Sequence, residues 1–150
     1  VGAMLDDVGA NEDQGSAYVF VRSGTIWTQR VKLIALDGAE EDLFGYAVAL
    51  SSDMALVGAE WDDVNANEDQ GSAYVFTRSG TAWSQQGKLS AADGAAEDDF
   101  GRSVALDGNM ALVGAPGDTI GANEYQGSVY FYDITIRYLF HLPLVLRNAP

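Results

Sequence analysis

The chain has 150 residues, 47% of them hydrophobic, which is enough to build a domain core and excludes a disordered composition. Its 22 acidic and 8 basic residues give a net charge of −14, which repels nucleic acid backbones and anionic lipid surfaces. We therefore expect no nucleic acid partner. We also expect no membrane insertion, because the longest apolar run, residues 138–146, is far below the roughly 20 residues of a membrane helix. Cysteine is absent, so disulfides stabilise nothing here.

The sequence repeats itself at a spacing of 56 residues. Residues 1–22 return as residues 57–78 with 18 of 22 positions identical, and more loosely as residues 113–132. The segment 42–59 returns in the same step as 98–115. Repeats at a fixed period of this size indicate one supersecondary unit that stacks on its neighbours.

Each repeat contains four short runs rich in Val, Tyr, Phe, Thr and Trp, and in the complete copy these are residues 44–51, 54–59, 71–78 and 81–90. Their length and their Gly, Asp, Asn and Ser borders predict strands. The short links between them predict antiparallel hairpins. Runs such as MALVGA do not alternate polar with apolar residues, so we expect both faces of each sheet to be covered by the next sheet. This predicts an all-β fold of tandem four-stranded antiparallel propeller blades, with a β-sandwich as the alternative.

Nine residues at strand borders carry a resemblance to a known family, and they are Phe44, Gly45, Gly58, Ala59, Phe100, Gly101, Gly114, Ala115 and Pro116. They resemble the FG-GAP repeat, the blade unit of integrin α-subunit propellers and of many bacterial surface proteins. The resemblance extends to about residue 133, although Met4 and Glu60 replace the proline of the motif. We expect the phenylalanines to fill the space between blades and the glycines to permit close backbone contact.

The chain provides about 2.7 repeats, whereas a propeller contains about four to eight blades. The predicted units are the C-terminal part of a first blade (1–36), a complete blade (37–92), a third blade (93–133) and a divergent strand or tail (134–150). Because the sequence starts within a repeat, we expect an incomplete propeller from a longer protein. Further blades from the parent chain or from other copies are needed to close the ring.

Alternate connections of a four-stranded meander emerge on the same side, which places the loop 60–70, its copies, and the links 37–42 and 93–99 on one face. These segments hold all 22 acidic residues except Asp53, Asp107 and Asp133. Solvated loops favour Asp and Asn in any protein, but the face could also attract cations or a basic partner. The resemblance to integrin-like propellers implies that this face binds ligands. The candidate contacts are Trp61, Asp62, Glu68, Asp98 and Asp99.

Asp63, Asn65, Asn67 and Asp69 place oxygen atoms at alternate positions, a spacing found in calcium loops. The first copy has Gly9 in place of Asn65, and the glycine and closing glutamate of an EF-hand are missing. The resemblance implies calcium sites in the first hairpin of a blade, which is too short here to wrap an ion. Calcium is thus a possible ligand, and no other cofactor is expected.

The residues for catalysis are scarce. His141 is the only histidine, and there is no cysteine and no G-x-S-x-G motif. Paired carboxylates could hydrolyse glycosides, but they recur in every copy as scaffold residues do. Trp27 and Trp83 recur at one repeat position and are expected to pack between blades, whereas Trp61 stands in a loop.

We therefore predict a protein that is not an enzyme. The resemblance implies a binding module of a secreted or cell-surface protein, with adhesion or recognition of a protein or glycan through the acidic loop face as its role. The alternatives are a non-catalytic module of a larger secreted hydrolase and a purely structural repeat.

Overall fold

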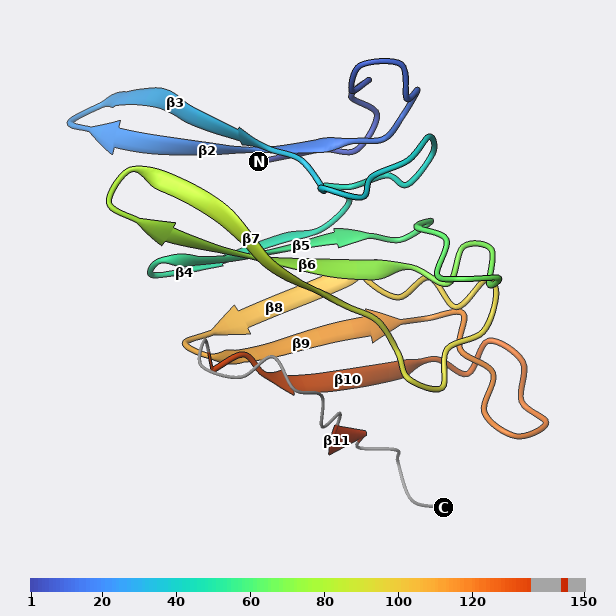
Figure 1. Ribbon diagram of the computed structural model, residues 1–150. Helices are drawn as coiled ribbons and strands as arrows, with labels where there is room; N and C mark the ends of the chain where they lie inside the picture. Colours follow the sequence, from blue (N-terminus) through green and yellow to red (C-terminus); the bar gives the residue numbers. More distant parts are fainter. Residues whose placement is uncertain (136–143, 146–150) are drawn as a thin grey trace.

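The computed structural model describes residues 1–135 and 144–145, and every regular element among them is a β-strand (Figure 1). The first sheet contains β1 (Gly2–Ala3), β2 (Ser16–Ser23) and β3 (Ile26–Leu33). The second sheet contains β4 (Val48–Ser51), β5 (Met54–Ala59), β6 (Ser72–Ser79) and β7 (Ala82–Leu89). The third sheet contains β8 (Ser103–Asp107), β9 (Met110–Ala115), β10 (Ser128–Asp133) and β11 (Leu144–Val145). Among these residues there is no helix that could cross a membrane.

Strands within each sheet follow chain order and pair antiparallel, which confirms the predicted all-β architecture of incomplete propeller blades. The predicted start of the first strand of the second repeat, at residue 44, was wrong, because β4 begins only at Val48. Leu43 and Gly45 have φ values of 56° and 97°, so the chain turns there instead of extending. The amide of Phe44 donates to the carbonyl of Gln14 in this turn.

The three sheets stack face to face, with the second sheet in the middle (Figure 1). One core cluster lies between the first and second sheets, where Ala17 and Leu33 meet Val57 and Phe76. A second cluster lies between the second and third sheets. All six residues of β5 are buried, because this strand has a sheet on each side.

Phe44 and Phe100 lie in these two cores at equivalent places. The Phe44 ring contacts Tyr74 edge to face at a centroid distance of 5.4 Å, and Phe100 contacts Tyr130 at the same distance. Beside them the sheets approach so closely that a Cβ atom on Gly58 would lie 1.9 Å from the carbonyl oxygen of Gly101. Only glycine fits at such a contact.

The expectation that both faces of every sheet are covered holds only for β5 and most of β6 in the middle sheet, since Val48 and Leu50 on β4 of that sheet are 43% and 63% exposed. Phe20 and Trp27 on the first sheet are 37% and 63% exposed, and Val129 on the third sheet is 47% exposed. The expected packing role fits Trp83, which packs against the first core cluster, but not Trp27. Trp27 is exposed because no sheet lies against the face on which it stands.

Leu144–Val145 extends the third sheet by pairing with β10 at Phe131 and Tyr130. The predicted terminal strand or tail of residues 134–150 otherwise lies largely outside the described residues, as does His141.

Candidate binding face

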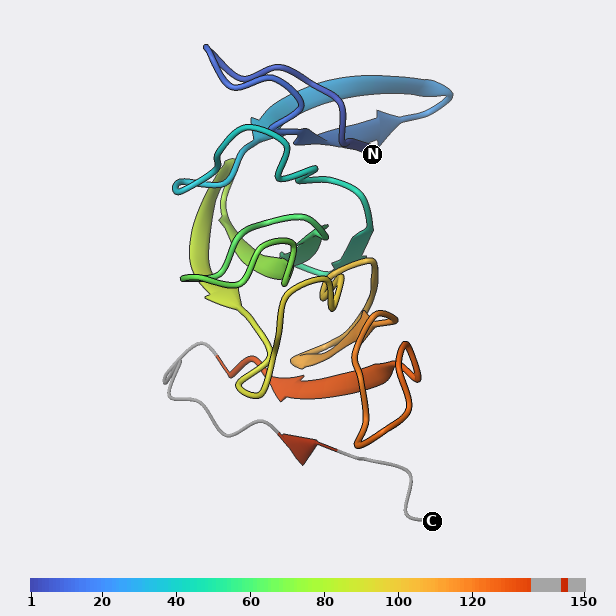
Figure 2. The ribbon, with the colours of Figure 1, turned by 90° about the vertical axis from the view of Figure 1, so that its right-hand side faces the viewer.

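Loops 4–14, 60–70 and 116–126 and links 37–42 and 93–99 gather at one end of the stacked sheets, here called the acidic loop face (Figure 2). Backbone hydrogen bonds join loops 4–14 and 60–70 to the links that follow them. The amides of Glu41 and Glu97 donate to the carbonyls of Glu12 and Glu68, respectively. These equivalent bonds hold the loops and links as one surface.

A hollow of about 290 Å³ lies on this face between link 37–42 and loop 61–69. Its lining is mostly acidic and consists of Asp37, Ala39, Glu40, Glu41, Asp42, Trp61, Asp62, Asp63, Glu68, Asp69 and Lys88. Eight carboxylates in this lining therefore face one ammonium group.

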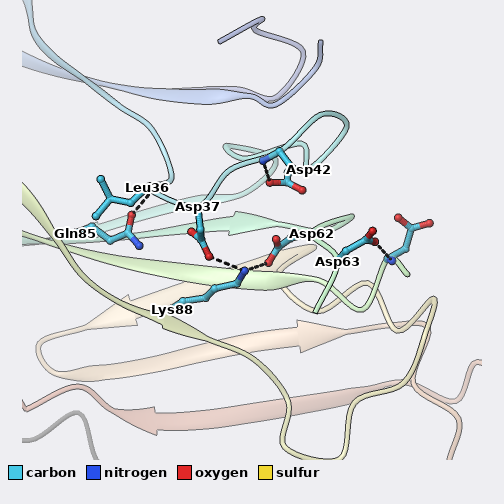
Figure 3. A network of polar contacts seen from close by, with 9 residues as sticks. Leu36, Asp37, Asp42, Asp62, Asp63, Gln85 and Lys88 are labelled. Atoms are coloured by element: carbon cyan, nitrogen blue, oxygen red, sulfur yellow. Dashed lines mark hydrogen bonds and ion pairs between the residues drawn. The ribbon is translucent and has the colours of Figure 1, made fainter. Parts of the chain in front are cut away.

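Lys88 reaches this hollow from β7 and bridges two carboxylates (Figure 3). Its Nζ atom lies 2.6 Å from Asp62 Oδ2 and 3.0 Å from Asp37 Oδ2. Burial opposes the charge of Lys88, but its bonds to Asp62 and Asp37 raise its pKa above the ordinary value. Burial raises the pKa of Asp62 despite the hydrogen bond from Lys88. The ammonium also lies 5.4 Å from the ring centre of Tyr74.

Asp42 occupies the wall of the same hollow and is only 3% exposed. Its Oδ2 atom accepts a hydrogen bond of 2.6 Å from the amide of Ala39. Burial raises the pKa of Asp42 to about 7, and the charges of Asp62 and Asp37 act in the same direction. Asp98 accepts the equivalent bond from Ala95, and burial raises its pKa as well.

The lysine pair recurs in the first repeat and is absent from the described part of the third. Lys32 lies 2.8 Å from Asp6, whose pKa falls to about 2 because it accepts hydrogen bonds from Lys32, Ser16 and Tyr18. In the third sheet Val145 pairs with Tyr130, whereas Lys88 pairs with the equivalent Tyr74 in the second. The three copies of this cluster are therefore not equal.

The structure separates the predicted contact residues into two groups. Trp61 is 44% exposed, and Glu68 is exposed beside it in the lining of the hollow. Asp62 and Asp98 are each 3% exposed and are bound within the chain. Asp99 forms an ion pair of 3.0 Å with Arg102. The acidic residues available to a ligand are thus fewer than the sequence predicts.

The predicted calcium loop is held by its own hydrogen bonds. Asp63 Oδ1 accepts from the amide of Asp69 at 3.0 Å. Asn67 Nδ2 donates to Gln70 Oε1 and to the carbonyl of Gly94. Asn65 has a φ of 60° and its counterpart Gly9 one of 68°, a conformation that asparagine and glycine tolerate best. Among the described residues no three His, Cys, Asp or Glu side chains gather closely enough to hold a metal ion.

Glu60, which replaces the proline of the motif, is 3% exposed and lies 3.5 Å from Arg102 of the following repeat. Burial raises its pKa to about 7, and the charge of Arg102 acts in the opposite direction. This substitution therefore adds an ion pair between neighbouring repeats.

Sequence reasoning missed the role of Lys32 and Lys88 and that of Asp37. The recurrence of Lys-Leu at residues 32–33 and 88–89 was a usable signal, because lysine is rare in so acidic a chain. Asp37 also recurs, as Asp93, but so do many acidic residues of this chain, and its ion pair with Lys88 is created only by folding.

Comparison with known proteins shows that a family model described as FG-GAP repeat matches residues 27–76 and 83–132. Each matched segment begins on the outer strand of one sheet, β3 or β7, and ends on β6 or β10 of the next sheet. A repeat of this family thus spans the contact between two neighbouring sheets. No curated protein matches the chain.

Proposed function

The chain belongs to the FG-GAP repeat family, and on this premise we propose that it is a binding module that recognises a basic protein partner through the acidic loop face. The family is typically non-catalytic and generally extracellular or at the cell surface. We place this chain in a secreted or cell-surface protein with a role in adhesion or in recognition of a protein or glycan. Within this class, the charge of the face favours a basic protein over a glycan.

The observation that carries the proposal is the acidic hollow between link 37–42 and loop 61–69. Its lining combines eight carboxylates with the single ammonium of Lys88, and that ammonium is already bound to Asp62 and Asp37. The excess negative charge lies in a recess, where the field is stronger than on a flat surface. A lysine or arginine side chain from a partner would reduce this excess.

Trp61 adds a second kind of contact to the same hollow. Its side chain is 44% exposed and therefore accessible to a partner. Tryptophan is enriched among the residues that contribute most of the binding energy in protein interfaces. A cation above its ring would gain attraction from the aromatic face. The combination of an exposed tryptophan with Glu40 and Glu68, both exposed, suits a basic side chain.

The test measures binding of a labelled lysine-rich peptide to the 150-residue chain by fluorescence anisotropy. The variant Glu40→Lys/Glu68→Lys changes two exposed residues of the hollow, which are not in its buried ion pair. Its matched control is Asp53→Lys/Asp107→Lys, which changes the net charge equally at the hairpin ends far from this face (Figure 1). We expect about tenfold weaker binding for the first variant only, and weaker binding of the unchanged protein at high salt.

Equal losses in both double variants would mean that the peptide responds to net charge alone, and the proposed site would then be rejected. Trp61→Ala supplies an independent readout, because it leaves the charge unchanged. We expect it to weaken binding several-fold without changing the circular dichroism spectrum.

A structural role is the second candidate, and the internal bonds of Asp42, Asp62 and Asp98 favour it. These carboxylates bind Ala39, Lys88 and Ala95 within the chain, so part of the acidity serves the loops themselves. Under this alternative the lysine-rich peptide binds neither the unchanged protein nor any variant above background.

A further inference from the structure

The acidic hollow between link 37–42 and loop 61–69 contains more carboxyl groups than its own basic residue can pair. The link contributes Asp37, Glu40, Glu41 and Asp42 to the lining, and β7 contributes Lys88. The loop contributes Asp62, Asp63, Glu68 and Asp69. Lys88 is the only basic residue of this lining, and it pairs with Asp62 and Asp37. Six of the eight carboxyl groups therefore have no basic partner within the lining.

Asp42 differs from the other five because it is buried, with an exposed fraction of 3%. Its Oδ2 atom accepts a hydrogen bond from the amide of Ala39. Burial raises the pKa of Asp42 to about 7, the charges of Asp62 and Asp37 add to this increase, and that of Lys88 opposes it. Near neutral pH a large share of the molecules thus carry a proton on Asp42. This proton removes one negative charge from the hollow.

Tyr74 of β6 provides an independent observation that points to a ligand. Its side chain is fully buried, and its hydroxyl has no hydrogen-bond partner among the described residues. Burial raises the pKa of Tyr74, and the charges of Asp62, Asp37 and Asp42, which all line the hollow, act in the same direction. The hydroxyl therefore lies on the side of the ring that faces the hollow.

The equivalent tyrosines of the other two repeats have partners. The hydroxyl of Tyr18 donates to Asp6 at 2.9 Å, and that of Tyr130 donates to Asp118 at 3.3 Å. A buried hydroxyl without a partner, such as that of Tyr74, costs free energy. An N–H group that enters the hollow and donates to this hydroxyl would remove the cost.

Building on the proposed function, we propose that a basic side chain of the partner enters the hollow beside Asp42 and Tyr74 and replaces the proton on Asp42. The carboxylic acid becomes a carboxylate paired with the partner's cation, and one proton passes to the solvent. Proton and cation exchange because each reduces the same excess of negative charge, and a nearby cation favours the ionised carboxylate. The hydroxyl oxygen of Tyr74 accepts a hydrogen bond from the entering group.

This coupling makes the affinity depend on pH in a defined direction. An opposite charge within about 4–6 Å lowers the pKa of a carboxyl group by about 1–3. Between this lowered value and about 7, the free protein holds the proton and the complex does not, so the affinity rises with pH. Above about pH 8 the free Asp42 is already ionised, and the affinity should no longer change. The partner would then bind at neutral pH and dissociate in an acidic environment.

Titration calorimetry of the 150-residue chain with the lysine-rich peptide measures affinity and proton release together. We expect binding to be about five- to tenfold weaker at pH 6 than at pH 8. At pH 6, the heats in two buffers of different ionisation enthalpy should show release of about one half to one proton for each peptide bound. The lysines of the peptide do not titrate in this range.

Asp42→Asn removes the titrating group. Its affinity should be equal at pH 6 and pH 8 and no higher than that of the unchanged protein at pH 6, and it should release almost no protons. The control is His141→Gln, which removes the only histidine of the chain and with it any imidazole that titrates in the same range. This control should retain the full pH dependence.

Tyr74→Phe tests the hydroxyl separately. We expect several-fold weaker binding at both pH values with the same pH dependence. The melting temperature should not fall, because the ring is retained and the lost hydroxyl has no partner.

Equal affinity at pH 6 and pH 8, without a difference between buffers, would overturn the proton coupling and leave the proposed function intact. The coupling to Asp42 would also be rejected if Asp42→Asn kept the pH dependence and His141→Gln abolished it. A peptide that binds at neither pH would reject the proposed function, and the coupling with it.

Discussion

The Nζ atom of Lys88 lies 2.6 Å from Oδ2 of Asp62, which is buried where loop 60–70 leaves the end of β5. The equivalent pair in the first repeat, Lys32 and Asp6, has the same short contact at 2.8 Å but is about one third exposed on both sides. The same repeat position therefore holds an ion pair with a buried carboxylate in the second repeat and an ion pair with a partly exposed carboxylate in the first.

We predict that Lys88→Met destabilises the protein by about 3 kcal/mol, because it leaves the Asp62 carboxylate buried without its cation. Lys32→Met should lower the melting temperature much less, because water solvates Asp6 after the change. Chemical unfolding of both variants provides the comparison. Similar losses would show that burial does not determine the strength of these pairs.

The buried carboxyl group of Asp42 should make stability depend on pH. Its pKa rises from 3.8 to about 7 in the folded protein, so between these values the folded state binds more protons than the unfolded state. Stability is then greatest at the acid end of this window and falls as the pH rises toward 7. Glu60, with a pKa raised to about 7, contributes in the same direction.

Asp42→Asn tests this dependence, because asparagine retains an oxygen for the amide of Ala39 but cannot ionise. We expect the free energy of unfolding of the variant to exceed that of the unchanged protein by about 1 to 2 kcal/mol at pH 8 and to equal it near pH 4. The slope between these values should become shallower without vanishing, since Glu60 still titrates. A slope unchanged from pH 4 to pH 8 would show that Asp42 ionises freely.

Gly58 and Gly114 are equivalent in the repeat but differ in their surroundings. A Cβ atom on Gly58 would lie 1.9 Å from the backbone oxygen of Gly101, whereas on Gly114 it would meet the rotatable side chain of Ser103 at 2.3 Å. Gly58→Ala should therefore separate the second and third sheets and cost about 2 kcal/mol or more, while Gly114→Ala should be tolerated. Thermal melting measures both, and equal losses would argue against close sheet contact as the cause.

Calcium binding at Asp63, Asn65, Asn67 and Asp69 stays a prediction, and titration calorimetry measures it. Binding would raise the melting temperature in calcium relative to EDTA, and Asp63→Asn would abolish this increase. A titration without heat, together with identical melting in calcium and EDTA, would remove the hypothesis.

Independently of calcium, Asn67→Ala should lower the melting temperature more than Asn123→Ala, because the Asn67 side chain also donates a hydrogen bond to the carbonyl of Gly94.

Much of the fold could be predicted because the same strand-forming segments recur at a step of 56 residues. Val57 and Val113 occupy one strand position, and the recurrence of their apolar neighbours at a constant step leaves only antiparallel sheets packed on one another as a consistent structure. The start of β4 was misplaced because Phe44 and Gly45 read as part of an apolar run, while the positive φ of Gly45 depends on contacts with the neighbouring sheet.

The sequence by itself determined the all-β architecture, the stacking of equivalent sheets and the placement of nearly all acidic residues on one face, because these follow from periodicity and from the alternation of connections. Only the tertiary structure decided which acidic residues face solvent and which are bound internally, as Glu68 and Asp62 illustrate. It also decided that Trp83 packs while Trp27 is exposed, although the two have the same position in the repeat. Burial depends on what lies against a residue in space, and identical local sequences carry no information about their neighbours.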